Sequence, residues 1–229
     1  MLVRLSNVDA GYGASTVLMG VDFEARAGEV NLITGPAAAG KTTFTHLVRL
    51  ALPPRSGRSV ILGVDLMRAR AREIADAKRR VGYVAENPTF IEQWSTFDNI
   101  AMPLRLLGQK PRDYEHDVRE RGFRWTWRRG RVGCGKLSGA ERRRAAIARA
   151  LAAKPTLLLA DDPTAGMSPA DGRRIVRLLS EMRRVGAGVV IASQDDTLSD
   201  VAPMWVWRVD RGRLSAPEQT EAADAEAYE

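Results

Sequence analysis

The sequence predicts an α/β fold with a mainly parallel central sheet and an antiparallel β part at the N-terminus. Two short apolar runs, residues 30–34 and 156–160, are typical of strands that are buried on both faces. Helical patterns follow both runs, and strands that alternate with helices favour a parallel sheet. The first residues, up to about residue 25, differ because they contain short strands in direct succession.

The first helix is expected to begin near Thr42, after the strand at residues 30–34 and a loop of small residues. Its apolar side chains recur at helical spacing, and Pro53 with Pro54 ends it. These apolar side chains are Phe44, Leu47, Val48 and Ala51. Residues 60–85 then read as a strand, a basic helix and a second strand.

The middle of the chain, about residues 88–136, has a different character because tryptophans lie there among many arginines. These residues are Trp94, Trp125, Trp127, Arg105, Arg112, Arg119, Arg121, Arg124, Arg128, Arg129 and Arg131. We interpret the segment as a helical lobe that is inserted in the main domain.

Beyond the lobe, the chain returns to alternating helices and strands. A helix over about residues 139–153 precedes the second apolar run, and a further helix precedes a strand over residues 189–193. The inward positions of that further helix are Ile175, Val176, Leu178, Leu179 and Met182. A hairpin over residues 205–214 turns at the Asp-Arg-Gly segment that starts at Asp210. We therefore expect one domain over residues 1–214.

Residues 215–229 form a tail of small and acidic residues without an apolar pattern, so we expect it to be disordered. Its acids are Glu218, Glu221, Asp224, Glu226 and Glu229, and it has no base. The rest of the chain is strongly basic, since the whole has 35 Lys and Arg against 28 Asp and Glu. Such a body favours anionic partners, but charge alone does not distinguish lipid, nucleic acid and nucleotide phosphates.

The composition is ordinary for a soluble globular protein, with 45% hydrophobic and 28% charged residues. No apolar run approaches the roughly 18 residues that cross a bilayer. The N-terminus also lacks the basic and apolar layout of an export signal. The one cysteine, Cys134, excludes an internal disulfide and suits a reducing cytoplasm, so a cytoplasmic location is expected.

One loop fits the phosphate-binding pattern G-x-x-x-x-G-K-S/T and lies between a predicted strand and a predicted helix, as the pattern requires. It consists of Gly35, Pro36, Ala37, Ala38, Ala39, Gly40, Lys41 and Thr42. Successive backbone N–H groups and a helix N-terminus form an anion site there. We expect Lys41 to reach the β- and γ-phosphates of a nucleotide and Thr42 to bind Mg²⁺. The alternative is a connection of small residues with a solvated lysine.

Asp161 and Asp162 follow the second apolar run, at the end of a strand where ligands of open α/β sheets bind. Asp161 is expected to hold Mg²⁺ through its water shell, and Asp162 is expected to polarise the attacking water. Alternatively, the Asp-Pro pair is turn chemistry, and Asp162 caps the next segment of the chain. The phosphate loop favours the magnesium interpretation.

A third segment, Leu137-Ser138-Gly139-Ala140-Glu141, precedes a helix rich in arginine and alanine. By itself, its S-x-x-E pattern predicts a capping box. Ser138 lies 23 residues before Asp161. The order and spacing of these two segments resemble those of the ABC-type ATPases, a family of P-loop NTPases. In that family, the equivalent serine and helix N-terminus face the γ-phosphate held by a second subunit. Both interpretations can hold, since a helix start is also an anion site.

The resemblance covers about residues 2–214 and implies a dimer that sandwiches two ATP molecules with Mg²⁺. Tyr12 matches the aromatic residue that stacks on adenine. Glu86 falls at a glutamine that links the nucleotide to the helical lobe, and Gln194 falls at a histidine that touches the γ-phosphate. The expected nucleotide-binding residues are Tyr12, Gly35, Pro36, Ala37, Ala38, Ala39, Gly40, Lys41, Thr42, Thr43, Ser138, Gly139 and Ala140. The expected metal ligands are Thr42, Asp161 and Glu86, and the expected catalytic residues are Asp162, Gln194 and Glu86.

Within the family, residues 8–35, 97–108 and 204–214 most resemble the FtsE branch, which acts in cell division with the membrane protein FtsX. ATPases of lipoprotein release and macrolide export share much of this sequence and stay open as alternatives. The resemblance implies an integral membrane partner and a position on the cytoplasmic face of the inner membrane. Residues 112–131 are a candidate contact for that partner or for anionic headgroups. A solvated basic face, with the tryptophans in the lobe core, is the alternative.

The chain departs from the family pattern where hydrolysis and coupling between subunits occur. The departures are Ala38 for Gly, Glu86 for Gln, Ala140 for Gly, Asp162 for Glu, Ser168 for Asp and Gln194 for His. Lys41, Thr42 and Asp161 are kept, so we expect ATP binding with slow turnover. A nucleotide-gated scaffold without productive hydrolysis is a second hypothesis. A DNA-associated ATPase is disfavoured, because neither heptads nor clustered cysteines are present.

Overall fold

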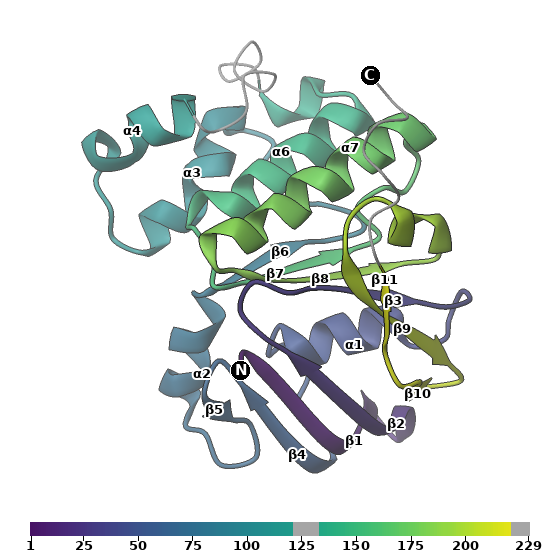
Figure 1. Ribbon diagram of the computed structural model, residues 1–229. Coiled ribbons are helices and arrows are strands. Elements are labelled where there is room, and N and C mark those ends of the chain that lie inside the picture. The colour runs from purple at the N-terminus through teal and green to yellow at the C-terminus, as the bar shows by residue number, and fades with distance from the viewer. Residues whose placement is uncertain (121–132, 221–229) are drawn as a thin grey trace.

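The computed structural model describes residues 1–120 and 133–220 (Figure 1). Their strands form two sheets. The antiparallel sheet has the order β2-β1-β4-β5. The central sheet has the order β10-β9-β3-β8-β7-β6, and β11 also pairs with β9. The strands are β1 (Val3–Tyr12), β2 (Ser15–Ala25), β3 (Val30–Thr34), β4 (Ser56–Ile61), β5 (Val64–Asp65), β6 (Val81–Val84), β7 (Leu157–Asp161), β8 (Gly188–Ser193), β9 (Met204–Asp210), β10 (Arg213–Leu214) and β11 (Glu218–Thr220).

The helices are α1 (Lys41–Val48), α2 (Ala71–Lys78), α3 (Thr96–Leu106), α4 (Pro111–Glu120), α6 (Gly139–Ala152) and α7 (Pro169–Ser180), with shorter turns η1 (Cys134–Lys136), η2 (Glu181–Val185) and η3 (Asp196–Asp200). Strands β9, β3, β8, β7 and β6 pair in parallel along the central sheet. The predicted α/β fold with a mainly parallel central sheet and an antiparallel N-terminal part is therefore confirmed.

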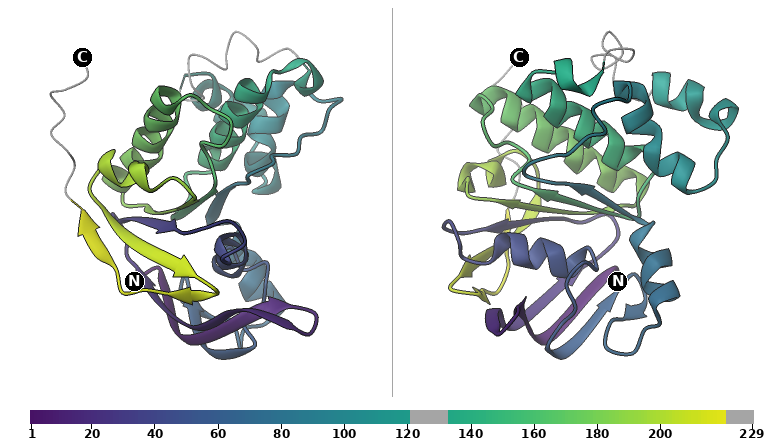
Figure 2. Two further views of the ribbon diagram at one scale, coloured as in Figure 1. Left: turned by 90° about the vertical axis from the view of Figure 1, so that its right-hand side faces the viewer. Right: turned by 180° about the vertical axis from the view of Figure 1, so that it is seen from behind.

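The central sheet lies between two layers, and this explains its apolar sequence. Helix α1 and the antiparallel sheet cover one face, while α6 and α7 cover the other (Figure 2). Every residue of β3, β7 and β8 is buried. Side chains alternate between the two cores along each strand: Leu157 and Leu159 of β7 enter the core with α1, and Leu158 enters the core with α7.

A third apolar core lies in the middle of the chain, between α3, α4 and the start of α6. It includes Ile100, Leu104, Tyr114, Cys134 and Ala145. The described part of the segment that we expected to be a lobe is therefore largely helical. Trp94 lies at its surface, where the Arg105 guanidinium is 5.6 Å from the centre of its ring. Residues 121–132 lie outside the described residues, so the bounds of the lobe stay a prediction.

We expected residues 215–229 to be disordered, and the described start of this tail differs from that expectation. Residues Glu218–Thr220 pair antiparallel with Met204–Val206 of β9. The reason is that β10 pairs with only the last two residues of β9, so the rest of that edge offers backbone N–H and C=O groups to another strand. The Thr220 hydroxyl adds a hydrogen bond of 3.2 Å to the carbonyl of Met204. Residues 221–229 lie outside the described part of the chain.

The C-terminal hairpin of β9 and β10 reaches the antiparallel sheet (Figure 2). Met19 N donates to Gly212 O at 2.8 Å. The predicted turn is found between Asp210 and Arg213, with φ values of 45° at Arg211 and 76° at Gly212. In the part of the chain that the structure describes, no helix has the length and the apolar character needed to cross a membrane.

Candidate functional site

The loop between β3 and α1 wraps around the side chain of Lys41. Lys41 is only 9% exposed. Its Nζ donates to the carbonyls of Gly35 and Pro36, both at 2.7 Å. Burial lowers the pKa of this ammonium group. Nearby carboxylates oppose that effect, and they belong to Asp162, Asp161, Asp196 and Glu86. The loop thus directs one cation toward a group of acids.

Two glycines of this loop are required by its geometry. Gly35 has a φ of 152°, and a Cβ there would lie 2.1 Å from the carbonyl oxygen of Val209. Gly40 has a φ of 115° and directly precedes α1. The C-terminal hairpin supports the loop from outside, since Gly212 N donates to Ala39 O at 3.0 Å. The strand-loop-helix setting predicted for the phosphate pattern is therefore present.

Ala38 occupies the strained position of the loop. Its φ is +60°, in the left-handed region that L side chains disfavour. The family pattern has glycine at this position, and glycine adopts a positive φ without strain. The structure shows that the alanine takes the glycine-like conformation, so the loop keeps its path at a cost in backbone strain of roughly 1 kcal/mol.

Asp161 ends β7 and is only 3% exposed. The Thr42 hydroxyl lies 3.5 Å from Asp161 Oδ1, and the Thr45 hydroxyl donates to Oδ2 at 3.0 Å. Tyr83 Oη lies 3.4 Å from Oδ2. Burial, together with the charge of Asp161, raises the pKa of Tyr83 to about 12. Thr45 and Tyr83 were not identified from the sequence, although Tyr83 lies on β6, the strand that pairs with β7.

The oxygens of Thr42 and Asp161 suit Mg²⁺, which prefers hard oxygen ligands. Adjacent ligands of an octahedral Mg²⁺ lie roughly 3 Å apart, close to the 3.5 Å found here. Within residues 1–120 and 133–220, no three side chains of Asp, Glu, His or Cys come together as a cage for a metal ion.

Asp162 follows β7 with a φ of +44°. Its side chain accepts a hydrogen bond from the Ser193 hydroxyl at 3.3 Å. Its backbone N–H donates to Ala192 O at 2.7 Å, and its carbonyl accepts from Arg143 Nη1 at 3.0 Å. Asp162 is therefore fixed between β8 and α6. Ser193 was not identified from the sequence, because only the strand pairing brings it here.

Ser138 begins α6 as the predicted capping box. Its hydroxyl accepts from Glu141 N at 3.3 Å, and its own N–H donates to Glu141 Oε2 at 2.9 Å. Gly139 and Ala140 form the exposed first turn of the helix. The capping role is confirmed, and the role toward a second subunit stays a prediction.

The remaining predicted site residues lie at the ends of strands. Glu86 follows β6 and Gln194 follows β8, both with exposed side chains. The effect of Glu86 on the pKa of Lys41 places its charge near the loop. Tyr12 ends β1, and its hydroxyl is 2.8 Å from Nδ1 of His46 on α1. Thr43 is buried in α1. Ser168, which stands where the family has Asp, accepts from Asp171 N and caps α7.

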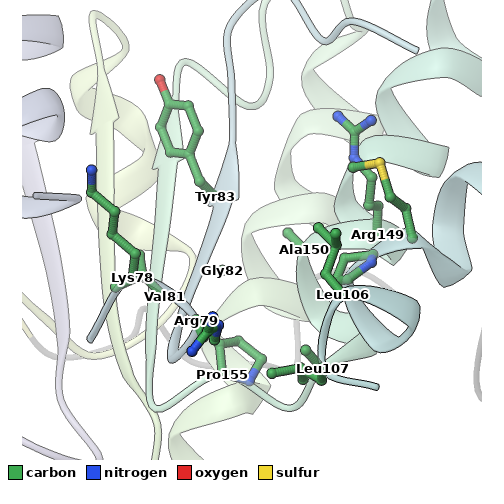
Figure 3. A pocket seen from close by; sticks show the side chains of 13 residues that line it. Lys78, Arg79, Val81, Gly82, Tyr83, Leu106, Leu107, Arg149, Ala150 and Pro155 are labelled. Atoms are coloured by element: carbon green, nitrogen blue, oxygen red, sulfur yellow. The ribbon is translucent and has the colours of Figure 1, made fainter. Parts of the chain in front are cut away.

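A groove of about 280 Å³ lies between β6, the end of α2, and helices α3 and α6. Figure 3 shows Lys78, Val81 and Tyr83 on one side and Leu106 and Arg149 on the other. The full lining is Lys78, Arg79, Val81, Gly82, Tyr83, Met102, Pro103, Leu106, Leu107, Arg149, Ala150, Ala153 and Pro155. Its floor is apolar, and its rim carries positive charge. Of the candidate partner segment at 112–131, only the part up to residue 120 is described, so that contact stays a prediction.

A family profile described as "ABC transporter" matches residues 18–165. The cell division ATP-binding protein FtsE of Escherichia coli K12 is 32% identical over 203 residues, which cover 86% of this chain and 90% of that protein. FtsE of Mycobacterium tuberculosis is 30% identical and covers 96% of both chains. The lipoprotein-releasing ATP-binding protein LolD of Hyphomonas neptunium is 33% identical over 86% of this chain and 90% of its own length.

Among solved structures, a dimeric ATP-binding cassette described as a post-hydrolysis state bound to ADP and Pi superposes with a TM-score of 0.84. The two sequences are 24% identical, and the match covers 97% of this chain and 100% of the other. Likeness at this level of identity concerns the fold.

Proposed function

This chain belongs to the ABC transporter family of ATP-binding subunits, and on that premise we propose that it binds Mg²⁺-ATP at a dimer interface and hydrolyses it slowly. The observation that carries the proposal is the convergence of Lys41, Thr42 and Asp161 at one loop. A buried cation, a hydroxyl and a carboxylate are the groups that hold a triphosphate and its metal. The first two come from the start of α1, and the third comes from β7.

Each of these groups has a distinct part in the proposal. Lys41 and the N–H groups of the loop bind the β- and γ-phosphates, while Thr42 and Asp161 hold the metal. When bound, Mg²⁺ would neutralise charge on those phosphates. Asp162 accepts a proton from the attacking water, and the hydrogen bond from Ser193 orients its carboxylate. In a dimer, Ser138 of one chain faces the γ-phosphate held by the other.

Slow turnover follows from three substitutions at this site. Asp162 is one methylene shorter than the glutamate of the family pattern, and a base set back by about 1 Å costs on the order of 100-fold in rate. Glu86 adds negative charge near the phosphates. Gln194 donates a hydrogen bond but cannot carry the positive charge of a histidine. Binding is retained in this proposal because Lys41, Thr42 and Asp161, which hold the phosphates and the metal, are all present.

ATP binding and cleavage are measured separately to test this function. Calorimetry with ATP should show binding that depends on magnesium and is weakened at least 10-fold in Lys41→Ala, because a charged group has lost its ligand. Single-turnover cleavage should be slow but faster than in the Lys41→Ala control. Absence of magnesium-dependent heat at millimolar ATP would contradict the proposal.

A nucleotide-gated scaffold is the second candidate, and the substitutions at Glu86, Asp162 and Gln194 favour it. It predicts intact ATP affinity and ATP-dependent dimerisation. The rate of ATP cleavage by the unmodified chain would then equal that of the Lys41→Ala control. This result would exclude the ATPase function and support the scaffold function.

We further propose that the chain works in cell division at the cytoplasmic face of the inner membrane, with an FtsX-like integral membrane subunit. The two FtsE relatives support this role, whereas LolD keeps lipoprotein release as an alternative. The groove of Figure 3 suits a cytoplasmic helix of that subunit with an apolar face and an acidic residue. Leu106 is 73% exposed at the groove, and Lys78 and Arg79 supply the complementary charge.

Co-purification of the membrane subunit from the native cells tests this partner. Leu106→Asp should reduce the amount recovered, because it places a negative charge in an apolar contact. Val185→Asp is the matched control, since Val185 is 75% exposed and lies on η2, outside the groove lining. Equal recovery with both variants would contradict docking at the groove. Recovery of a lipoprotein-release subunit would contradict the cell-division role and support a role in lipoprotein release.

A further inference from the structure

Tyr12 ends β1 as an aromatic side chain that is held in place and yet left open to solvent. Its hydroxyl lies 2.8 Å from Nδ1 of His46, and the two rings meet edge to face with centroids 6.4 Å apart. Tyr12 nevertheless remains 47% exposed. A large ring that is oriented by a hydrogen bond at its polar end, rather than packed into a core, offers a surface for stacking.

The turn that follows Tyr12 is fixed by Arg55, which lies just before β4. Arg55 Nη1 donates to Ala14 O at 3.3 Å and to Thr16 Oγ1 at 3.2 Å. Nη2 of the same side chain donates to Gly13 O. One planar guanidinium group therefore joins two carbonyls of the turn between β1 and β2 and one hydroxyl at the start of β2. This turn carries no apolar anchor of its own, since residues 13–16 are all exposed.

The position of Tyr12 relative to the phosphate loop indicates which part of a ligand would stack on it. Thr42 and His46 are four residues apart in α1, so they share a helix face and lie roughly 6 Å apart along the axis. A nucleotide whose terminal phosphates contact Lys41 extends beyond this length through its α-phosphate and ribose. Its base can therefore reach the ring beside His46.

We propose that His46 and Arg55 are positioning residues that preform Tyr12 as a stacking platform for a purine base. The inference rests on the proposed nucleotide binding. A ring that is already oriented loses little conformational freedom when the ligand binds, and this favours affinity. Burial and the nearby charge of Arg49 lower the pKa of His46, although Asp161 opposes them. A neutral imidazole keeps one ring nitrogen as an acceptor for the Tyr12 hydroxyl.

The test compares Mg²⁺-ATP with magnesium tripolyphosphate, which has the phosphates but no base. Calorimetry on the full chain gives both affinities for Tyr12→Phe, His46→Leu, Arg55→Ala and the double variant Tyr12→Phe/His46→Leu. The single variants should weaken ATP binding about 3- to 10-fold, the effect of one or two hydrogen bonds. Tripolyphosphate affinity should stay within about twofold, which also shows that the phosphate loop remains folded.

Two further variants separate positioning from general stability. His46→Asn keeps an acceptor close to the place of Nδ1 and should restore most of the ATP affinity. Arg58→Ala is the matched arginine control, because the Arg58 side chain is 73% exposed on β4. The double variant should bind ATP no more weakly than His46→Leu, since both changes remove one hydrogen bond.

The outcomes separate this inference from the function on which it rests. Unchanged ATP affinity in His46→Leu and Arg55→Ala would overturn the inference alone. An equal loss for ATP and tripolyphosphate would also overturn it, because the effect would then lie in the phosphate loop. If the unmodified chain binds neither ligand, the proposed function is overturned together with the inference.

Discussion

The Ser193 hydroxyl donates a hydrogen bond of 3.3 Å to Oδ1 of Asp162, across the parallel strands β7 and β8. Ser193 is buried and Asp162 is half-buried. The carboxylate is therefore oriented from the side of β8. An aspartate held in this way has little freedom to move forward, so its shorter reach affects the position of the base directly.

Asp162→Glu is expected to raise the rate of ATP hydrolysis by about 10- to 100-fold, because the longer side chain restores the reach of the base. ATP affinity should change little, since Lys41 and Asp161 are untouched. Single-turnover cleavage measures the rate, and Asp162→Asn is the control that should lower the residual rate further. A rate that is unchanged by Asp162→Glu would show that position 162 does not limit hydrolysis.

Ala38→Gly is expected to leave the free energy of unfolding unchanged or to raise it by up to about 1 kcal/mol. Relief of the left-handed strain at φ +60° offsets the entropy that glycine adds to the unfolded chain. Ala37→Gly is the matched control in the same loop, where no positive φ has to be relieved. It should lower stability by roughly 0.5–1 kcal/mol. Urea unfolding measures the free energy of unfolding of both variants. Equal destabilisation by Ala38→Gly and Ala37→Gly would contradict backbone strain at Ala38.

The fold could be predicted because its central strands have a local signature. Most residues of β3 and β7 are apolar, as expected of strands that are buried on both faces; the exceptions are Asn31, Thr34 and Asp161. The loop that ends in Lys41 and Thr42 could also be predicted, because the phosphate pattern is contiguous in sequence. Asp161 could be added from its place at the end of a buried strand.

The side-chain contacts that hold the site residues in place could not be predicted, because they depend on which strands lie side by side. Ser193 meets Asp162 only through the parallel register of β7 and β8, and Tyr83 meets Asp161 only through β6. The strand at Glu218–Thr220 was missed for a related reason. It forms by backbone pairing with a free edge, and its polar side chains give no apolar signal.

His46 is expected to make stability depend on pH. Burial and Arg49 lower its pKa in the folded state below the ordinary value of 6.5. Above pH 6.5, the imidazole is neutral in both states and this contribution is fully present. As the pH falls below 6.5 toward the folded pKa, only the unfolded state takes up a proton, so the free energy of unfolding decreases. The decrease should be small, because His46 is only half-buried and solvent screens the charge of Arg49.

Urea unfolding at pH 7.5, 6.5 and 5.5 checks this effect of His46. All groups other than residue 46 are the same in both proteins, so the comparison is between the unmodified chain and His46→Asn. The variant should lose less stability on acidification than the unmodified chain. If both proteins lose the same free energy of unfolding between pH 7.5 and 5.5, the result contradicts a lowered pKa of His46 in the folded state.

Ser138 is expected to have two separable roles, as the cap of α6 and as a group that faces the γ-phosphate of a second chain. In a Glu141→Gln background, which keeps the capping box, Ser138→Ala should cost about 1 kcal/mol of stability. Ser138→Asp should stay within about 0.5 kcal/mol, because aspartate caps as well as serine and favours the helix N-terminus. Its charge would nevertheless repel the γ-phosphate.

Sedimentation with ATP tests the second role, with Asp162→Asn added so that the nucleotide is not consumed. Ser138→Asp should abolish ATP-dependent dimerisation although the helix keeps its cap. Ser138→Ala should weaken dimerisation only partly, because the helix N-terminus still attracts the phosphate. If the Ser138→Asp variant dimerises with ATP as readily as the protein that retains Ser138, residue 138 faces no phosphate. The Ser138 hydroxyl then acts only within its own helix.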